Sequence, residues 1–202
     1  MNLPNKLTVA RLLATPFFVA ALSLDFSGNY LLGLTIFLVA MLTDYLDGVL
    51  ARSRGQVTRL GMLIDPLADK ILISSAFICF VSIPEIGLPA WMAIVIISRE
   101  FAITGLRLLA AGQGKIMPAG RWGKHKTISQ VVAVAGTLLY LSLFYDSRAD
   151  VEQYRWVIMV LAWATVFMTT FSGLYYMVSN YRCLLVEMER EAMPAGTGEE
   201  ND

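Results

Sequence analysis

Four aspartates stand close together in a chain that is otherwise mainly apolar. Asp44 and Asp47 end one apolar run, and Asp65 and Asp69 open the next. A carboxylate near hydrocarbon costs at least a few kcal/mol, and four of them would also repel one another. A divalent cation offsets both costs. Oxygen ligands without histidine or thiolate favour Mg²⁺ or Mn²⁺, and four carboxylates can hold two such ions, as recurs in phosphoryl transfer.

The spacing within each aspartate pair suits a helix. Asp44 and Asp47 are three residues apart, and Asp65 and Asp69 are four apart, so each pair projects from one helical face. A short basic loop joins the two runs. We therefore expect antiparallel neighbouring helices whose carboxylates converge.

The residues around the pairs fit a phosphate-bearing ligand. Gly48 and Ala51 follow the first pair and let a bulky group approach the helix closely. Arg52 offers a bidentate fork for a phosphate oxygen. Gly61 removes side-chain bulk before the second pair.

Composition indicates the setting of these residues. The 202-residue chain is 56% hydrophobic and 16% charged, with a mean hydropathy of +0.60. Soluble domains average about 25% charged residues, so we expect an integral membrane protein. The formal net charge of zero predicts no nucleic-acid partner.

Apolar runs of about 20 residues predict membrane-spanning helices. We expect an all-α integral membrane protein with six transmembrane helices and a short N-terminal amphipathic segment at Pro4 and Asn5. The expected spans cover residues 8–24, 30–50, 66–83, 89–110, 126–145 and 152–181. They form one membrane domain, 1–188, followed by a disordered acidic tail, 189–202.

The distribution of basic residues predicts the orientation. With six spans, fourteen of the sixteen lysines and arginines lie on or near the side of the two termini, and only Arg148 and Arg155 lie on the other. The positive-inside rule then places both termini and the aspartates in the cytoplasm.

The pattern DxxDGxxAR, then eight residues, then GxxxDxxxD, over residues 44–69, resembles the signature of the CDP-alcohol phosphotransferases at every defined position. The resemblance implies a six-helix membrane fold, usually a homodimer, in which an alcohol displaces CMP from a CDP-linked lipid. It also implies two metal ions, with Asp44 and Asp65 bridging both, Asp47 completing one site, and Asp69 completing the other while acting as general base. The CDP-lipid would be bound by Thr8, Gly48, Ala51, Arg52, Thr58 and Gly61.

A second group of cations predicts the acceptor. Arg99 and Arg107 lie two helical turns apart in one apolar run, and Arg121, Lys124 and Lys126 follow. This is more positive charge than four aspartates require. It suggests an acceptor with its own anionic group, most simply a phosphate.

Three segments carry a finer resemblance. LPNKLTVAR, SREFAITGLR and GRWGKHKT resemble the phosphatidylglycerophosphate synthases of bacteria. That resemblance implies CDP-diacylglycerol and sn-glycerol 3-phosphate as substrates, phosphatidylglycerophosphate and CMP as products, and a multi-pass position among the lipids of a bacterial cell membrane, with the active site facing the cytoplasm.

Other interpretations stay open at this stage. Arg99 and Glu100 could form a structural ion-pair network, and Lys124 and Lys126 could anchor a helix end to anionic headgroups. His125 is expected at the surface. The enzyme could instead make phosphatidylserine, cardiolipin or an inositol phospholipid. A divalent-cation transporter is a distant alternative.

Overall fold

The described part of the chain folds into six helices. The computed structural model describes residues 3–54, 59–112, 121–145 and 148–179. Within those ranges it contains no strand, which confirms the all-α prediction; the expected tail, 189–202, lies outside them. The helices are α1 (Leu3–Ser23), α2 (Asn29–Arg54), α3 (Arg59–Ser82), α4 (Ala90–Gly112), α5 (Arg121–Phe144) and α6 (Arg148–Ser179).

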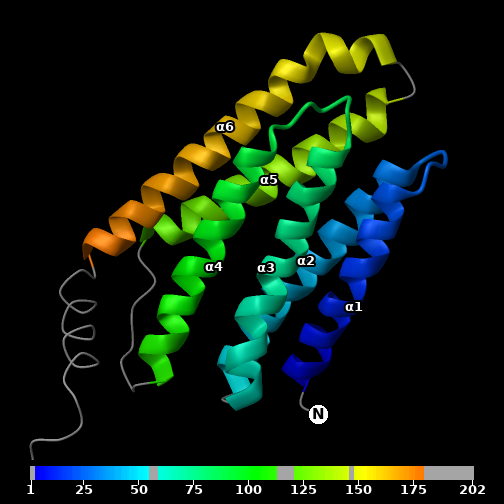
Figure 1. Cartoon of the computed structure of the whole chain (residues 1–202). Helices are drawn as coiled ribbons and strands as arrows, with labels where there is room; N and C mark the ends of the chain where they lie inside the picture. Colours follow the sequence, from blue (N-terminus) through cyan, green and yellow to red (C-terminus); the bar gives the residue numbers. More distant parts are fainter. Residues whose placement is uncertain (1–2, 55–58, 113–120, 146–147, 180–202) are drawn as a thin grey trace, which may run out of the picture.

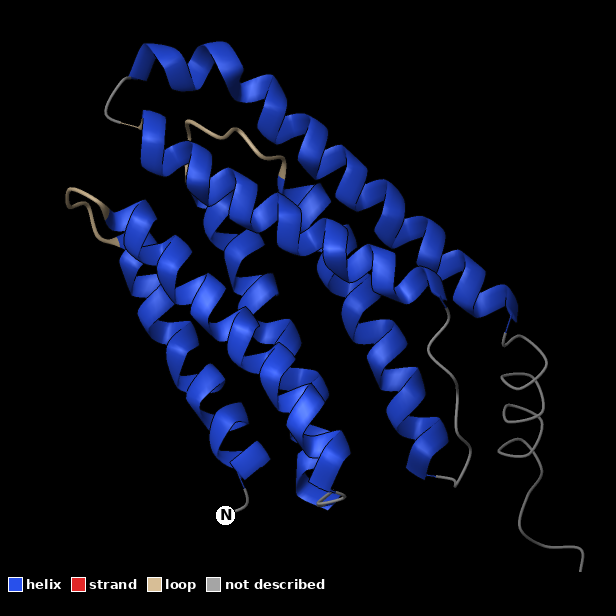
Figure 2. Cartoon of the chain, turned by 180° about the vertical axis from the view of Figure 1, so that it is seen from behind, coloured by secondary structure: helices blue, strands red, loops and turns tan. Residues whose placement is uncertain are grey.

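Successive helices run in alternating directions, as Figure 1 shows. The start of α1, the end of α2, the start of α3 and the end of α4 therefore lie at one end of the bundle. Helix α1 packs against α2 and α3, α5 packs against α2, α3 and α6, and α4 packs against α3 and α6. Figure 2 shows the same bundle from behind, with the described loops 24–28 and 83–89 joining α1 to α2 and α3 to α4. Helices α2 and α3 are antiparallel, as predicted, and share α1 and α5 as packing partners.

Most of the helices begin before the expected spans, and after α1 the difference is largest for α3 and α5. Helix α3 begins at Arg59 rather than at residue 66, and α5 begins at Arg121 rather than at residue 126. Polar residues can continue a helix whose apolar part alone is visible to hydropathy. The expected N-terminal segment is continuous with the first span, because α1 begins at Leu3 and runs through Pro16.

Large apolar side chains fill the interior. The Phe18 and Phe37 rings join α1 to α2, with their centroids 6.2 Å apart. The two helices approach closely at Gly33, where a β-carbon would lie 2.8 Å from the Leu22 Cδ2 atom. The other most deeply buried apolar side chains are Leu72, Phe77, Ile86, Met92, Ile96, Val134, Leu138 and Leu141.

The outer surface is strongly apolar while the interior holds polar groups. Phe17, Phe167 and Val178 are each at least 65% exposed, whereas Glu100 and Lys126 are 3% and 6% exposed. Large apolar side chains on the outer surface and charged side chains in the interior are the reverse of the usual arrangement in a soluble protein, where charged residues are mostly exposed. Large exposed apolar surface marks a contact with membrane or with another protein.

Two segments of the described helices are long and apolar enough to cross a membrane, His125–Phe144 and Arg155–Ser179. Shorter apolar helical segments are Val9–Ser23, Asn29–Thr43 and Lys70–Ser82. Length and composition thus support two of the six expected spans directly.

Candidate active site

The backbone sets the two aspartate pairs at matching depths. Asp44 lies ten residues before the end of α2, and Asp69 lies ten residues after the start of α3. At a rise of 1.5 Å per residue, each lies about 15 Å from its helix end, and residues 55–58 join those ends. Asp47 and Asp65 lie between, also at similar depths. The four side chains are outside the described part of the structure, so their convergence stays a prediction.

The donor set fits hard divalent cations. Four carboxylates on two antiparallel helices supply the oxygen ligands that Mg²⁺ and Mn²⁺ prefer. Among the side chains that the structure describes, no group of three or more His, Cys, Asp or Glu residues gathers elsewhere. The aspartates of α2 and α3 therefore remain the candidates for a metal site.

The residues predicted to bind the CDP-lipid lie at the same end of the bundle (Figure 1). Gly48, Ala51 and Arg52 lie in the last two turns of α2, Gly61 in the first turn of α3, and Thr8 in the second turn of α1. Thr58 lies outside the described residues, as does the side chain of Arg52. The backbone thus brings three helix ends together around the predicted site.

Glu100 is the centre of a buried polar network between α4 and α5. Its Oε2 atom is ion-paired with the Nζ atom of Lys126. Its Oε1 atom accepts a hydrogen bond of 3.2 Å from Gln130 Nε2 and one of 3.3 Å from Arg99 Nη1. Both carboxylate oxygens are therefore satisfied by neighbours, as a buried charge requires.

Arg99 carries this network to α6. Its Nη2 atom donates a hydrogen bond of 2.9 Å to the Ser172 hydroxyl. The next residue, Gly173, leaves room for the guanidinium, because a β-carbon there would lie 3.2 Å from Arg99 Nε. That Nε atom is buried without a hydrogen-bond partner among the described residues.

Arg107 meets α6 two turns further along α4. Its Nε atom donates to the Tyr176 hydroxyl at 3.4 Å, and its guanidinium carbon lies 5.0 Å from the centroid of the Tyr176 ring. A guanidinium over an aromatic face is held by a cation–π attraction. Arg99 and Arg107 are thus both oriented by α6.

Lys70 of α3 lies between Asp69 and the charged residues of α4 and α5. It follows Asp69 directly in α3. It lines a small cavity of about 10 Å³ together with Ile73, Glu100, Lys126, Thr127 and Gln130. The described side chains that line this cavity include two lysines and one carboxylate. The backbone therefore places the last aspartate one residue from the cavity.

The other predicted acceptor residues lie in the first turn of α5. Arg121 and Lys124 belong to that helix, but their side chains are outside the described part of the structure. His125 is exposed, as expected. Lys126 is 6% exposed, so it faces the bundle interior rather than anchoring the helix end to headgroups.

Sequence reasoning missed the partners of the cations. Gln130 lies four residues after Lys126, and Ser172 and Tyr176 are four apart in α6. Thr165 and Thr169 continue the α6 series toward the N-terminus, and both are buried. Polar residues repeating at helical spacing within an apolar helix are a signal for a buried polar face. That signal was present in the sequence.

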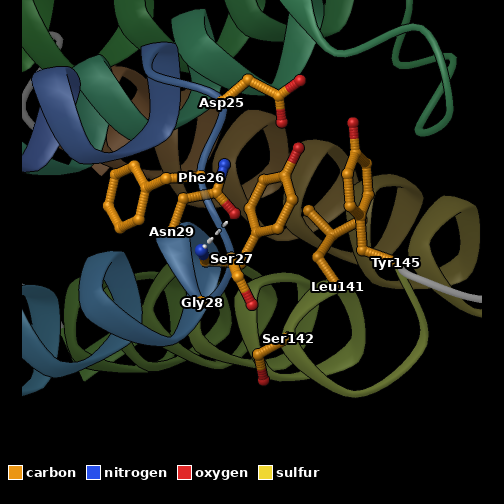
Figure 3. A pocket seen from close by; sticks show the side chains of 9 residues that line it. Asp25, Phe26, Ser27, Gly28, Asn29, Leu141, Ser142 and Tyr145 are labelled. Carbon is orange, nitrogen blue, oxygen red and sulfur yellow. Dashed lines mark hydrogen bonds between the residues drawn. The ribbon is translucent and has the colours of Figure 1, made fainter.

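A larger cavity lies at the opposite end of the bundle. It has a volume of about 290 Å³ and is lined by Asp25, Phe26, Ser27, Gly28, Asn29, Tyr30, Leu141, Ser142 and Tyr145. Figure 3 shows that the α1–α2 connection and the end of α5 supply these side chains from two sides. At the start of α2, the Oδ1 atom of Asn29 accepts a hydrogen bond of 2.8 Å from the backbone N–H of Tyr30. None of the predicted site residues lines this cavity.

An aspartate pair on each of two antiparallel helices, with cations beside the second, is the arrangement expected of a helical-bundle enzyme that acts on phosphate esters. The chain belongs to the CDP-alcohol phosphatidyltransferase family, whose sequence model matches residues 1–168. The match includes all four aspartates and the cation group. It gives no support to the transporter interpretation.

Several similar proteins are named for the same enzymatic activity. A CDP-diacylglycerol–glycerol-3-phosphate 3-phosphatidyltransferase of Bacillus subtilis is 40% identical over 195 residues, covering 91% of this chain and 97% of that protein. One of Haemophilus influenzae is 34% identical, covering 82% and 90%. One of Pseudomonas fluorescens is 38% identical, covering 66% and 70%. The likeness therefore extends over nearly the whole length of two of these proteins.

Proposed function

We propose that this enzyme transfers the phosphatidyl group of CDP-diacylglycerol to sn-glycerol 3-phosphate, giving phosphatidylglycerophosphate and CMP. The names of the similar proteins support both substrates. The observation that carries the acceptor is the contact of Lys70, next to Asp69, with the cavity that Glu100 and Lys126 line. Cations beside Asp69 suit an alcohol that carries a phosphate.

We place the protein in the bacterial cell membrane with six transmembrane helices, both termini and the active site facing the cytoplasm. The exposed apolar side chains and buried polar groups support membrane insertion. The concentration of basic residues at one end of the bundle supports the orientation. The homodimer that the family resemblance implies is part of this proposal.

Asp44, Asp47, Asp65 and Asp69 would hold two Mg²⁺ or Mn²⁺ ions. When bound, such ions neutralise charge on a pyrophosphate and on a departing phosphate. Thr8, Gly48, Ala51, Arg52, Thr58 and Gly61 would bind the CDP-lipid, the glycines by leaving space and Arg52 through its guanidinium.

Asp69 would accept the proton of the 1-hydroxyl of glycerol 3-phosphate. The hydroxyl oxygen forms a bond to the β-phosphorus, which carries the diacylglycerol. The bond between that phosphorus and the CMP oxygen breaks, and CMP leaves with the electron pair. No covalent enzyme intermediate is required, because one displacement accounts for both products.

Arg99 and Arg107 would orient the acceptor phosphate, together with Arg121 and Lys124 at the start of α5. Fixing the acceptor in line with the phosphorus converts part of its binding energy into rate. The contacts of Arg99 with Ser172, and of Arg107 with Tyr176, preorganise both guanidinium groups.

Acceptor-dependent release of CMP tests this function. Purified protein in detergent or nanodiscs is given CDP-diacylglycerol and one of four acceptors: glycerol 3-phosphate, serine, phosphatidylglycerol or inositol. CMP is expected only with glycerol 3-phosphate and is expected to disappear with EDTA and return with Mg²⁺ or Mn²⁺. CMP release with another acceptor alone would assign a different transferase of the family.

A further inference from the structure

The pairing of Glu100 with Lys126 changes which cations are available to bind the acceptor phosphate. Sequence alone suggests that Lys126 binds the acceptor phosphate directly. In the structure its ammonium group is buried and paired with the Glu100 carboxylate. The same carboxylate also contacts Arg99 Nη1 at 3.3 Å. One negative charge thus lies between two positive charges.

We propose that Glu100 and Lys126 act as a neutral positioning pair that leaves the charge of Arg99 available to the acceptor phosphate. Lys126 therefore acts through Glu100 rather than on the phosphate. This inference rests on the proposed function, because it concerns the anionic acceptor of that reaction.

The electrostatics of the network explain why the pair matters. With Lys126 present, Glu100, Lys126 and Arg99 together carry one positive charge. Without Lys126, the carboxylate neutralises Arg99, and the contribution of Arg99 to the attraction for a phosphate is lost. Buried charges interact strongly because water screens them little.

Burial also predicts how the pair responds to substitution. Removing one partner of a buried ion pair leaves an uncompensated charge, whereas replacing both by neutral residues of similar volume is often tolerated. Gln130 and Arg99 can still hydrogen-bond to an amide oxygen at position 100. A double neutral replacement therefore keeps the shape of the network and restores its net positive charge.

The test compares Lys126→Met, Glu100→Gln and the double variant in CMP-release assays. We expect Lys126→Met to raise the KM for glycerol 3-phosphate about 10-fold or more, with little change in the KM for CDP-diacylglycerol. The double variant should return to within about 3-fold of the wild-type value. Glu100→Gln alone should not raise this KM, although it should lower thermal stability.

Gln130→Met is the matched control, because it removes one hydrogen bond of the same carboxylate without changing a charge. Its KM for glycerol 3-phosphate should change less than that of Lys126→Met. If Lys126 binds the phosphate directly, the double variant will be as impaired as Lys126→Met. If the pair only holds helices together, Lys126→Met will lose thermal stability with an unchanged KM. Either result overturns the positioning pair.

The wild-type assay separates this inference from the proposed function. If CMP release requires a different acceptor, the proposed function fails and the same KM comparison is made with that acceptor. An anionic acceptor with the predicted recovery in the double variant supports the pair. An uncharged acceptor overturns it, because no phosphate would then need the charge of Arg99.

Discussion

The two ends of α5 meet very different surroundings. At its start, Lys126 and Gln130 enter a network of charged and polar side chains around a cavity of about 10 Å³. At its end, Leu141 and Ser142 line a cavity of about 290 Å³. Leu141 lies 15 positions after Lys126, which separates these regions by about 22 Å along the helix.

Under the proposed function, the larger of these two cavities does not mark the reactive end of this bundle. The larger cavity is lined by the α1–α2 connection, the start of α2 and the end of α5. The aromatic contact of Tyr30 with Tyr145, with 4.6 Å between ring centroids, belongs to packing. The smaller cavity adjoins an ion pair and the residue after Asp69. Burying charged side chains costs free energy, and binding a phosphate group would be a functional reason to retain them.

The largest expected effect is that of replacing Asp69 in α3. Asp69→Asn should lower kcat by about 10³-fold or more, because the amide cannot accept the proton of the attacking hydroxyl. Binding of CDP-diacylglycerol, measured by a fluorescent analogue in the presence of Mg²⁺, should be largely retained. Substantial turnover by this variant would remove Asp69 as the general base.

The general architecture could be predicted from sequence because apolar length is a local property. All six helices were expected, in the right order, from runs of apolar residues. The starts of α3 and α5 were misplaced because Arg59 and Arg121 extend those helices beyond the apolar part. Hydropathy indicates which part of a helix suits a lipid environment. It does not indicate at which residue the helical backbone hydrogen bonds begin.

The site could be predicted only in part, because its partners are distant in sequence. An ion pair involving Arg99 and Glu100 was one open alternative. The pairing of Glu100 with Lys126 spans 26 positions, and that of Arg99 with Ser172 spans 73. Contacts of this kind depend on how helices pack, which spacing within one helix does not specify. The metal and CDP-lipid residues stay predictions, because their side chains lie outside the described structure.

The second-largest effect is expected when a cation of α4 is replaced. Arg107→Ala should raise the KM for glycerol 3-phosphate by about 10-fold or more, because a cation near the acceptor phosphate is lost. The KM for CDP-diacylglycerol should change much less. Tyr176→Phe is the matched control, since it keeps the ring under the guanidinium and removes only the hydroxyl that accepts from Arg107. Equal changes for both substrates in Arg107→Ala would argue against an acceptor site on α4.

The smallest effect is expected at the large cavity, and it tests the contrast most directly. Asp25→Asn removes the carboxylate that lines this cavity while keeping nearly the same shape. Because surface substitutions away from special features usually change stability by less than about 0.5 kcal/mol, kcat/KM for both substrates should stay within about 2-fold of wild type. Asp69→Asn, assayed in parallel, makes the same chemical change on α3 and should be inactive. A large loss of activity in Asp25→Asn would instead connect the two ends of the bundle, and the reactive region would then extend well beyond the helices that carry the aspartates.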